Sequence, residues 1–105
     1  MPIDLRDEEV TELAGMFHLM GDPTRLRILL ACLEQPISVG AIATRLDRSA
    51  SLVSHHLRLL RAARLLRGER RGRQVFYAPA DEHVRSVVAN MVGHVGETAA
   101  RHRAA

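Results

Sequence analysis

Four residues near the C-terminus have side chains that bind divalent metal ions: Asp81, His83, His94 and Glu97. Imidazole nitrogens and carboxylate oxygens are common ligands of tetrahedral Zn²⁺. On a helix, the eleven residues from His83 to His94 make just over three turns, so both histidines lie near one face. The same separation is about 16 Å along the helix axis, whereas ligands of one ion lie ~4 Å apart or less. One helix therefore cannot close these four groups around a single ion.

A second copy of the segment, laid antiparallel to the first, brings the two pairs of ligands together. Asp81 and His83 of one chain then lie opposite His94 and Glu97 of the other, and a two-fold axis generates two equivalent sites. We therefore predict a homodimer whose metal sites straddle the interface. The competing interpretation is that Asp81 is a first-turn acid stabilised by the helix dipole and that the histidines are ordinary surface residues.

Size and composition restrict the classes of protein that this chain can form. We predict a single domain over residues 1–105, with no room for an enzyme domain beside a binding module. Aromatic residues are only 3% of the chain, so the core should be aliphatic, and dimerisation would add useful burial. The single cysteine, Cys32, excludes a disulfide within one chain. No stretch can span a bilayer, and acids stand where a signal peptide would be basic, so we expect a cytoplasmic protein without membrane contact.

Charge is distributed unevenly along the chain. All fifteen basic residues are arginine, and the formal net charge is +3. Residues 1–50 hold five arginines against eight acids, whereas residues 51–105 hold ten arginines against four acids. This asymmetry predicts that a polyanion binds the second half of the chain.

Apolar residues spaced three and four apart predict helices in the first third of the chain. The first helix covers 7–20 and is amphipathic, with its apolar stripe at Val10, Leu13, Ala14, Phe17 and Met20. Met16 and Leu19 widen this stripe toward a dimer partner. Asp22 and Pro23 predict the start of a second, mostly buried helix.

The segment 38–63 has the pattern of a helix-turn-helix: a short helix capped by Ser38, a break at 47–50, and a longer helix. Val53, Leu57 and Leu60 form the predicted buried stripe of the longer helix. Polar side chains project from its other side and suit base-edge and phosphate contacts in the major groove: Ser51, Ser54, His55 and Arg58. A solvated helix face is the alternative.

The segment 65–78 predicts a basic hairpin directly after the recognition helix, which is the wing of a winged helix. Its tip is predicted over 68–73, where Arg70, Arg71 and Arg73 are placed to contact phosphate. A last helix is predicted over 80–98, with a loose tail at 99–105. It carries more apolar residues than it needs to pack on its own domain: Val84, Val87, Val88, Met91, Val92 and Val95. The predicted fold is therefore mainly α with a small β-hairpin, a winged helix-turn-helix whose first and last helices form the homodimer interface.

In the order of its parts, the chain resembles the ArsR/SmtB family of bacterial metal-sensing transcriptional repressors. The resemblance rests on 21-GDPTRLRILL-30, 51-SLVSHHLRLLRAARLL-66, the wing ending 75-VFY-77, and the four metal-binding residues. The resemblance implies that an apo dimer binds an operator palindrome in double-stranded DNA and that metal binding releases it. It also implies that Ala50, Ser51, Ser54 and His55 meet the major groove. In related sensors the ligand equivalent to His94 bonds a backbone carbonyl at the end of the recognition helix, which here is that of Arg64.

The same resemblance bears on the choice of metal. The spacing Asp-x-His, ten residues, His-x-x-Glu is that of the family's zinc-type sensors, and two imidazoles with two carboxylates suit Zn²⁺. Related Ni²⁺ and Co²⁺ sensors add histidines from their tails, and His102 is the candidate for that role here. Ser38 and Gly40 stand in the short helix where arsenic and cadmium sensors place cysteines, which argues against a soft-metal site there.

Three other readings stay open. The chain could be a winged-helix regulator of the same fold that does not sense metal, or one that responds to oxidation at Cys32, although a lone cysteine in an apolar helix has no resolving partner. A metal-dependent hydrolase would need an open coordination position in a cleft, for which this sequence offers no element, so we predict that the chain is not an enzyme.

Overall fold

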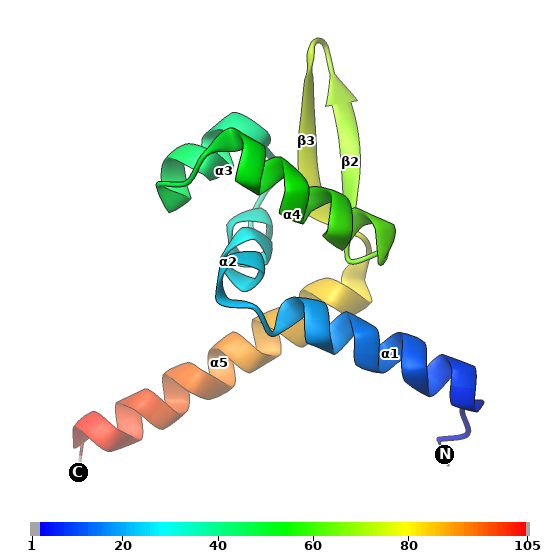
Figure 1. Ribbon diagram of the computed structural model, residues 1–105. Coiled ribbons are helices and arrows are strands. Elements are labelled where there is room, and N and C mark those ends of the chain that lie inside the picture. Colours follow the sequence, from blue (N-terminus) through cyan, green and yellow to red (C-terminus); the bar gives the residue numbers. More distant parts are fainter. Residues whose placement is uncertain (1–2, 105) are drawn as a thin grey trace.

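The computed structural model describes residues 3–104, which form five α-helices and three β-strands (Figure 1). In chain order these are α1 Asp7–Met20, α2 Pro23–Cys32, β1 Ile37–Ser38, α3 Val39–Leu46, α4 Ala50–Ala62, β2 Leu66–Arg71, β3 Gln74–Pro79 and α5 Glu82–Ala104. The predicted architecture of helices with one small hairpin is confirmed. The sheet has a further short strand, β1, that pairs with β3 to give the order β1-β3-β2.

Side-chain caps fix where three of the helices begin. Asp22 accepts a hydrogen bond from the backbone N–H of Arg25 at 3.0 Å, and Pro23 occupies the first turn of α2. Ser38 caps α3, and Ser49 caps α4 in the same way. A cap satisfies an amide that no carbonyl of the helix can reach, and it contributes about 1 kcal/mol. The predicted caps Asp22 and Ser38 are confirmed.

The core lies between α2, α3, α4 and the base of the hairpin. It is aliphatic, as predicted, and its large side chains are 0–1% exposed: Ile28, Leu29, Ile42, Val53, Leu57, Leu60 and Leu65. Val53, Leu57 and Leu60 are the predicted buried stripe of α4, which is confirmed. Their burial holds α4 against the domain and leaves its opposite face outward.

The hairpin stands at the end of the molecule opposite to α1 and α5 (Figure 1). Its strands pair from Leu66 with Pro79 to Arg71 with Gln74. Only Gly72 and Arg73 lie between the strands, and Gly72 takes a left-handed φ of 63°, which glycine adopts at no steric cost. The predicted tip of 68–73 is therefore too long: the residues from Gly68 to Arg71 belong to β2.

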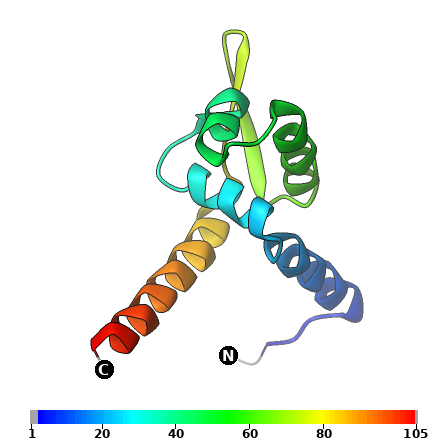
Figure 2. The same cartoon turned by 60° about the vertical axis from the view of Figure 1, so that its left-hand side comes forward.

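Helices α1 and α5 diverge from the domain on the side away from the hairpin (Figures 1 and 2). The prediction that Met16 and Leu19 point toward a dimer partner is wrong. Met16 and Leu19 pack against the core together with Met20, whereas Val10, Leu13 and Phe17 are 44–54% exposed. Both stripes are apolar, so the side that faces the domain depends on where α2 and α5 lie.

The last helix is longer than predicted. It continues from the predicted end near 98 to Ala104, through alanines and arginines that favour helix. Arg101, His102 and Arg103 in its last turn complement the helix dipole. Within residues 3–104, no helix combines the length and the apolar character needed to cross a membrane.

Candidate metal centre and nucleic-acid interface

The four predicted metal ligands are exposed and lie along α5 or directly before it. Asp81 precedes the helix and caps it, because its Oδ1 accepts a hydrogen bond from the N–H of Val84 at 3.0 Å. The second carboxylate oxygen of Asp81 can still bind an ion. His83 follows in the first turn, and it borders a small apolar cleft that also contains Leu65. His94 and Glu97 lie in the distal half of α5.

Across residues 3–104, one chain does not bring three or more His, Cys, Asp or Glu side chains together in a way that could hold a metal ion. The structure therefore places Asp81 and His83 at one end of α5, with His94 and Glu97 about 16 Å along the axis. The donor set itself, two imidazoles and two carboxylates on an exposed helix, has the chemistry of a Zn²⁺ site. Within one chain it lacks the geometry of one.

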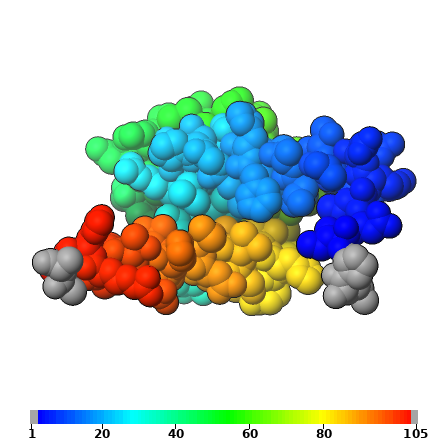
Figure 3. Space-filling view, turned by 90° about the horizontal axis from the view of Figure 1, so that it is seen from below, coloured from blue at the N-terminus to red at the C-terminus, as the bar shows by residue number. Residues whose placement is uncertain are grey.

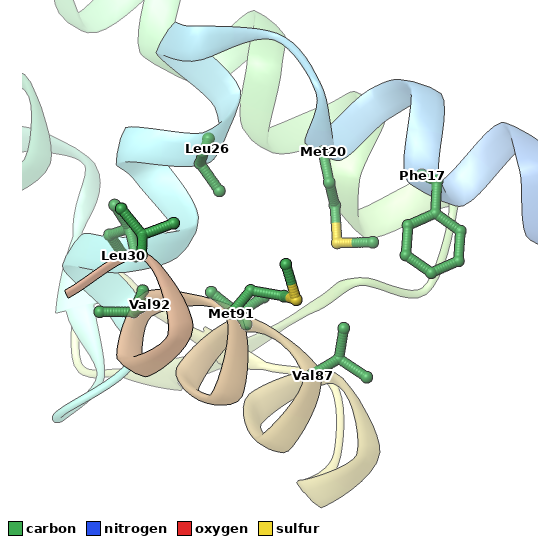
Figure 4. A pocket seen from close by; sticks show the side chains of 9 residues that line it. Phe17, Met20, Leu26, Leu30, Val87, Met91 and Val92 are labelled. Carbon is green, nitrogen blue, oxygen red and sulfur yellow. The ribbon is translucent and has the colours of Figure 1, made fainter. Parts of the chain in front are cut away.

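An apolar groove runs between α1, α2 and α5 on the face seen in Figure 3. Its volume is about 410 Å³, and its walls carry no charged side chain. Figure 4 shows the side chains from the three helices directed toward one another across the groove. They are Phe17, Met20, Leu26, Leu30, Val87, Val88, Met91, Val92 and Val95. Of the α5 residues in it, only Val88 is buried, and Val95 is 62% exposed.

The outward face of α4 carries the predicted DNA-contacting side chains. Ala50, Ser51, His55 and Arg58 are exposed, and Ser54 is half-buried. They lie on the side of α4 opposite its buried stripe, so they can contact a ligand without any change in the core. The helix has no acidic residue, and its N-terminal end carries the positive end of the helix dipole, which favours an anion.

The predicted wing arginines are all exposed, but they are not equivalent. Arg73 is in the turn, and Arg70 is on one face of β2. Arg71 is on the other face, where it donates to Oε2 of Glu69 at 2.9 Å and stacks over the Phe76 ring at 5.0 Å. Hydrogen bonds from Arg67 and Arg71 hold the pKa of the Glu69 carboxyl below its usual value.

Sequence reasoning named Arg71 and missed the role of Glu69 and Arg67. The signal was present in the sequence, because residues 67, 69 and 71 alternate in a strand and therefore share one face. Once 68–71 had been assigned to a loop, that alternation carried no meaning.

His56 is a second residue that sequence reasoning missed. It sits on α4 beside the first turn of α2, and its Nδ1 is buried without a hydrogen-bond partner among the described residues. Burial lowers the pKa of His56, and the charges of Arg25 and His55 lower it further, while Asp22 opposes them. The adjacent pair 55-HH-56 was a visible signal: neighbouring positions on a helix point in different directions, so one ring can face DNA while the other packs inward.

Cys32 is fully buried in α2, in the apolar helix to which the sequence assigns it. Burial raises the pKa of its thiol to about 12. The thiolate is the species that reacts with oxidants, so this cysteine is unreactive in the folded protein.

The chain matches the family model for "Bacterial regulatory protein, arsR family" over residues 22–67. It is 36% identical over 91 residues to a transcriptional repressor SmtB homolog of Synechocystis, covering 87% of this chain and 69% of that protein. It is 36% identical over 107 residues to the HTH-type transcriptional regulator KmtR of Mycobacterium tuberculosis, covering 99% of this chain and 82% of that one.

Two solved structures resemble the chain. A homodimeric winged helix-turn-helix DNA-binding domain from Mycobacterium bovis superimposes with a TM-score of 0.80 at 24% identity, covering 96% of this chain and 95% of that chain. The cadmium metal-sensor CMTR from Mycobacterium tuberculosis gives a TM-score of 0.66 at 39% identity, covering 75% and 82% respectively.

The fold is thus that of a winged helix-turn-helix transcriptional regulator, with α3 and α4 as the helix pair and the β2–β3 hairpin as the wing. The chain belongs to the arsR family of bacterial regulatory proteins. The predicted family and fold class are confirmed, and the relatives from Synechocystis and Mycobacterium tuberculosis with 36% identity are a transcriptional repressor homolog and a transcriptional regulator.

The lowered pKa of His56, whose ring is half-buried with its Nδ1 enclosed, predicts a pH dependence of folding stability. Because its pKa is lowered in the folded state, its contribution is fully present above the unfolded value of ~6.5 and is lost as pH falls through the lower folded value. His56→Gln should therefore flatten the decline of the free energy of unfolding between pH 7 and 5. Chemical denaturation at a series of pH values measures this, with exposed His18→Gln as the control. A wild-type slope in His56→Gln would contradict it.

Proposed function

We propose that the chain is a homodimeric, metal-responsive transcriptional repressor. The dimer binds an operator palindrome, and a divalent cation held between the two α5 helices, most favourably Zn²⁺, lowers its affinity for DNA. The observation that carries the proposal is the arrangement of α5. Two pairs of proposed ligands lie about 16 Å apart along a helix, and between them Val87, Met91 and Val92 are exposed.

The apolar groove supplies the reason for a dimer. Val87, Met91, Val92 and Val95 are 42–62% exposed, and they adjoin exposed Phe17 of α1. A contiguous uncharged surface of this kind marks an interaction site in a soluble protein. We propose that a second copy of the chain occupies the groove. The α5 helix that provides the apolar surface also carries two of the four proposed ligands at its start and the other two in its distal half. Antiparallel pairing of two α5 helices would cover the apolar surface and bring all four ligands of each metal site together.

The donor set and the length of α5 favour four-coordinate Zn²⁺. Asp81 and His83 of one chain with His94 and Glu97 of its partner supply two imidazoles and two carboxylates. Because α5 runs without a break to Ala104, His102 lies about 12 Å along the axis from His94. That separation disfavours a fifth ligand from the same helix, and so disfavours an expanded Ni²⁺ or Co²⁺ shell, which is the alternative.

The start of α5 is tied to the end of the recognition helix. The N–H of Ala80, next to Asp81, donates to the carbonyl of Leu65 at 3.0 Å. Between Leu65 and α4 lies Arg64, whose left-handed φ of 60° turns the chain into the wing, and its carbonyl is the proposed acceptor for the His94 ring. A bound ion would supply a fixed cross-link between the two α5 helices. The crossing of those helices sets the separation of the two α4 helices, which must match half-sites about 34 Å apart.

Under this proposal the chain acts by binding and not by catalysis, as one domain of residues 1–105 in the cytoplasm. The ligands lie on an exposed helix, not in a cleft with a general base beside an open coordination position. The half-buried Ser54 and the exposed Ala50, Ser51, His55 and Arg58 would face the major groove, with Arg70, Arg71 and Arg73 on the flanking phosphates.

Dimerisation through α5 can be tested with one charge. Met91→Glu places a carboxylate in the apolar groove and should yield a monomer, because a buried unpaired charge is costly. Sedimentation velocity measures the change. Ala89→Glu, exposed and on the opposite side of α5, is the matched control and should remain dimeric. If Met91→Glu sediments as the wild-type dimer, α5 is not the interface.

The metal site predicts a repressor that no longer responds to its inducer. His83→Ala and His94→Ala should each abolish tight binding of Co²⁺ or Zn²⁺ and leave the affinity of the apo protein for DNA unchanged. Cobalt absorption spectroscopy reports the site directly, because intense d–d bands at one ion per chain indicate four-coordinate geometry. His18→Ala, an exposed histidine of α1, should bind metal normally. Normal metal-induced release by both ligand variants would show that the ion binds elsewhere.

The recognition helix predicts a sequence-specific loss of affinity. Ser54→Ala or His55→Ala should weaken operator binding by about tenfold, within the range of one base or phosphate contact, without changing metal stoichiometry. Fluorescence anisotropy on operator and scrambled duplexes separates specific from general binding. Unchanged operator affinity in both variants would remove α4 as the reading element.

A further inference from the structure

The wing carries one acid among four arginines. Between Leu66 and Pro79 the only Asp or Glu is Glu69, and the arginines are Arg67, Arg70, Arg71 and Arg73. Glu69 is half-buried on β2, directly opposite Phe76 of β3. Both of its carboxylate oxygens are used: Oε1 accepts from Arg67 and Oε2 accepts from Arg71 at 2.9 Å.

These are the guanidinium donors that a DNA phosphate would take. Carboxylate and phosphate oxygens present the same acceptor geometry to an arginine fork. Arg71 is further held by the Phe76 ring beneath its guanidinium. By contrast, no carboxylate among residues 3–104 forms an ion pair with Arg70 or Arg73. The wing therefore has two kinds of arginine: Arg67 and Arg71 are paired with the Glu69 carboxylate, whereas Arg70 and Arg73 form no ion pair with a described carboxylate.

Stability alone gives no reason for this arrangement. Exposed ion pairs contribute little to folding, and the side chains of Arg67 and Arg71 are 49% and 54% exposed. The effect on a polyanion is larger, because each arginine that neutralises a phosphate releases a counterion and adds about 0.9 to the salt dependence of the logarithm of the binding constant.

We propose that Glu69 limits the affinity of the wing for DNA by occupying Arg67 and Arg71 in place of phosphate. The inference rests on the proposed DNA binding of this chain and identifies the residue that restrains it. Docking of the wing must exchange the Glu69 carboxylate for a phosphate, and the carboxylate then remains beside the duplex as a like charge. The hydrogen bonds that lower the pKa of Glu69 keep it ionised throughout the neutral range, so the restraint does not vary with physiological pH.

The test is the near-isosteric substitution Glu69→Gln, which keeps the side chain's volume and removes its charge. We expect the variant to bind a non-specific duplex at least about fivefold more tightly at 0.15 M salt, with a salt slope steeper by about one for each of Arg67 and Arg71 that becomes available to phosphate. Glu34→Gln is the matched control, because it makes the same change in net charge at an exposed residue outside the wing. Equal or weaker binding by Glu69→Gln, relative to Glu34→Gln, would overturn the proposal.

A double-mutant cycle separates occupation of the arginine from general charge. Arg71→Gln should cost more affinity in the Glu69→Gln background than in the wild type, because only there is Arg71 fully available to phosphate. Arg70→Gln should cost the same in both backgrounds. Equal costs for Arg71→Gln in the two backgrounds would count against the proposal even if Glu69→Gln alone binds more tightly.

Failure of the proposed function gives a different result. If the wild-type protein shows no salt-dependent binding to any duplex, then DNA binding itself is wrong and the inference falls with it. If the wild type binds and only the effects of Glu69→Gln are missing, the regulator stands and the role of Glu69 does not.

Discussion

The structure depends on an apolar helix face that its own domain does not cover. Helix α5 has 23 residues and is about 35 Å long, yet only Val88 in it is buried. Other apolar residues of α5, namely Val87, Met91, Val92 and Val95, stay exposed in one chain, because the remaining helices close the core around α2 and α4. We propose a second α5 as its cover, which also accounts for the positions of the four proposed ligands. Two pairs of proposed ligands about 16 Å apart on one helix cannot bind the same ion in the monomer. In an antiparallel pair of helices, one pair from each chain could bind the same ion.

Much of this architecture could be predicted from local chemistry. Asp22, Pro23 and Ser38 mark helix starts through hydrogen bonds that involve neighbours only, so no tertiary information was needed. The stripe of Val53, Leu57 and Leu60 was equally clear, because polar residues surround it. The candidate metal residues were found by type and spacing, and their spacing excludes closure of all four around one ion within one helix. Among residues 3–104 the structure brings no three His, Cys, Asp or Glu side chains together at a possible metal site.

What could not be predicted depends on contacts between distant segments. Helix α1 has apolar residues on two adjacent stripes, and only the position of α2 and α5 decides that Met16 and Leu19 face the domain while Phe17 faces outward. The length of the wing strands follows from pairing across the hairpin, which overrides the turn-like composition around Gly68. The buried Nδ1 of His56 is likewise a consequence of α4 packing beside α2. Periodicity reports that a face is apolar, but not which neighbour covers it.

A repressor that an ion must release from DNA cannot bind DNA too tightly, and this requirement relates the wing to α5. Allosteric coupling in proteins amounts to about 1–3 kcal/mol, so an ion can weaken DNA binding by roughly 5- to 150-fold. One additional arginine–phosphate contact strengthens DNA binding about fivefold at 0.15 M salt. This gain offsets a substantial part of the weakening that the ion can produce. A regulator with ten arginines in its second half therefore gains from restraining some of them. We propose that Glu69 does so at the wing, which stands at the end of the molecule opposite to α5. Recognition of sequence by α4 and spacing of the dimer by α5 would then be unaffected by this restraint.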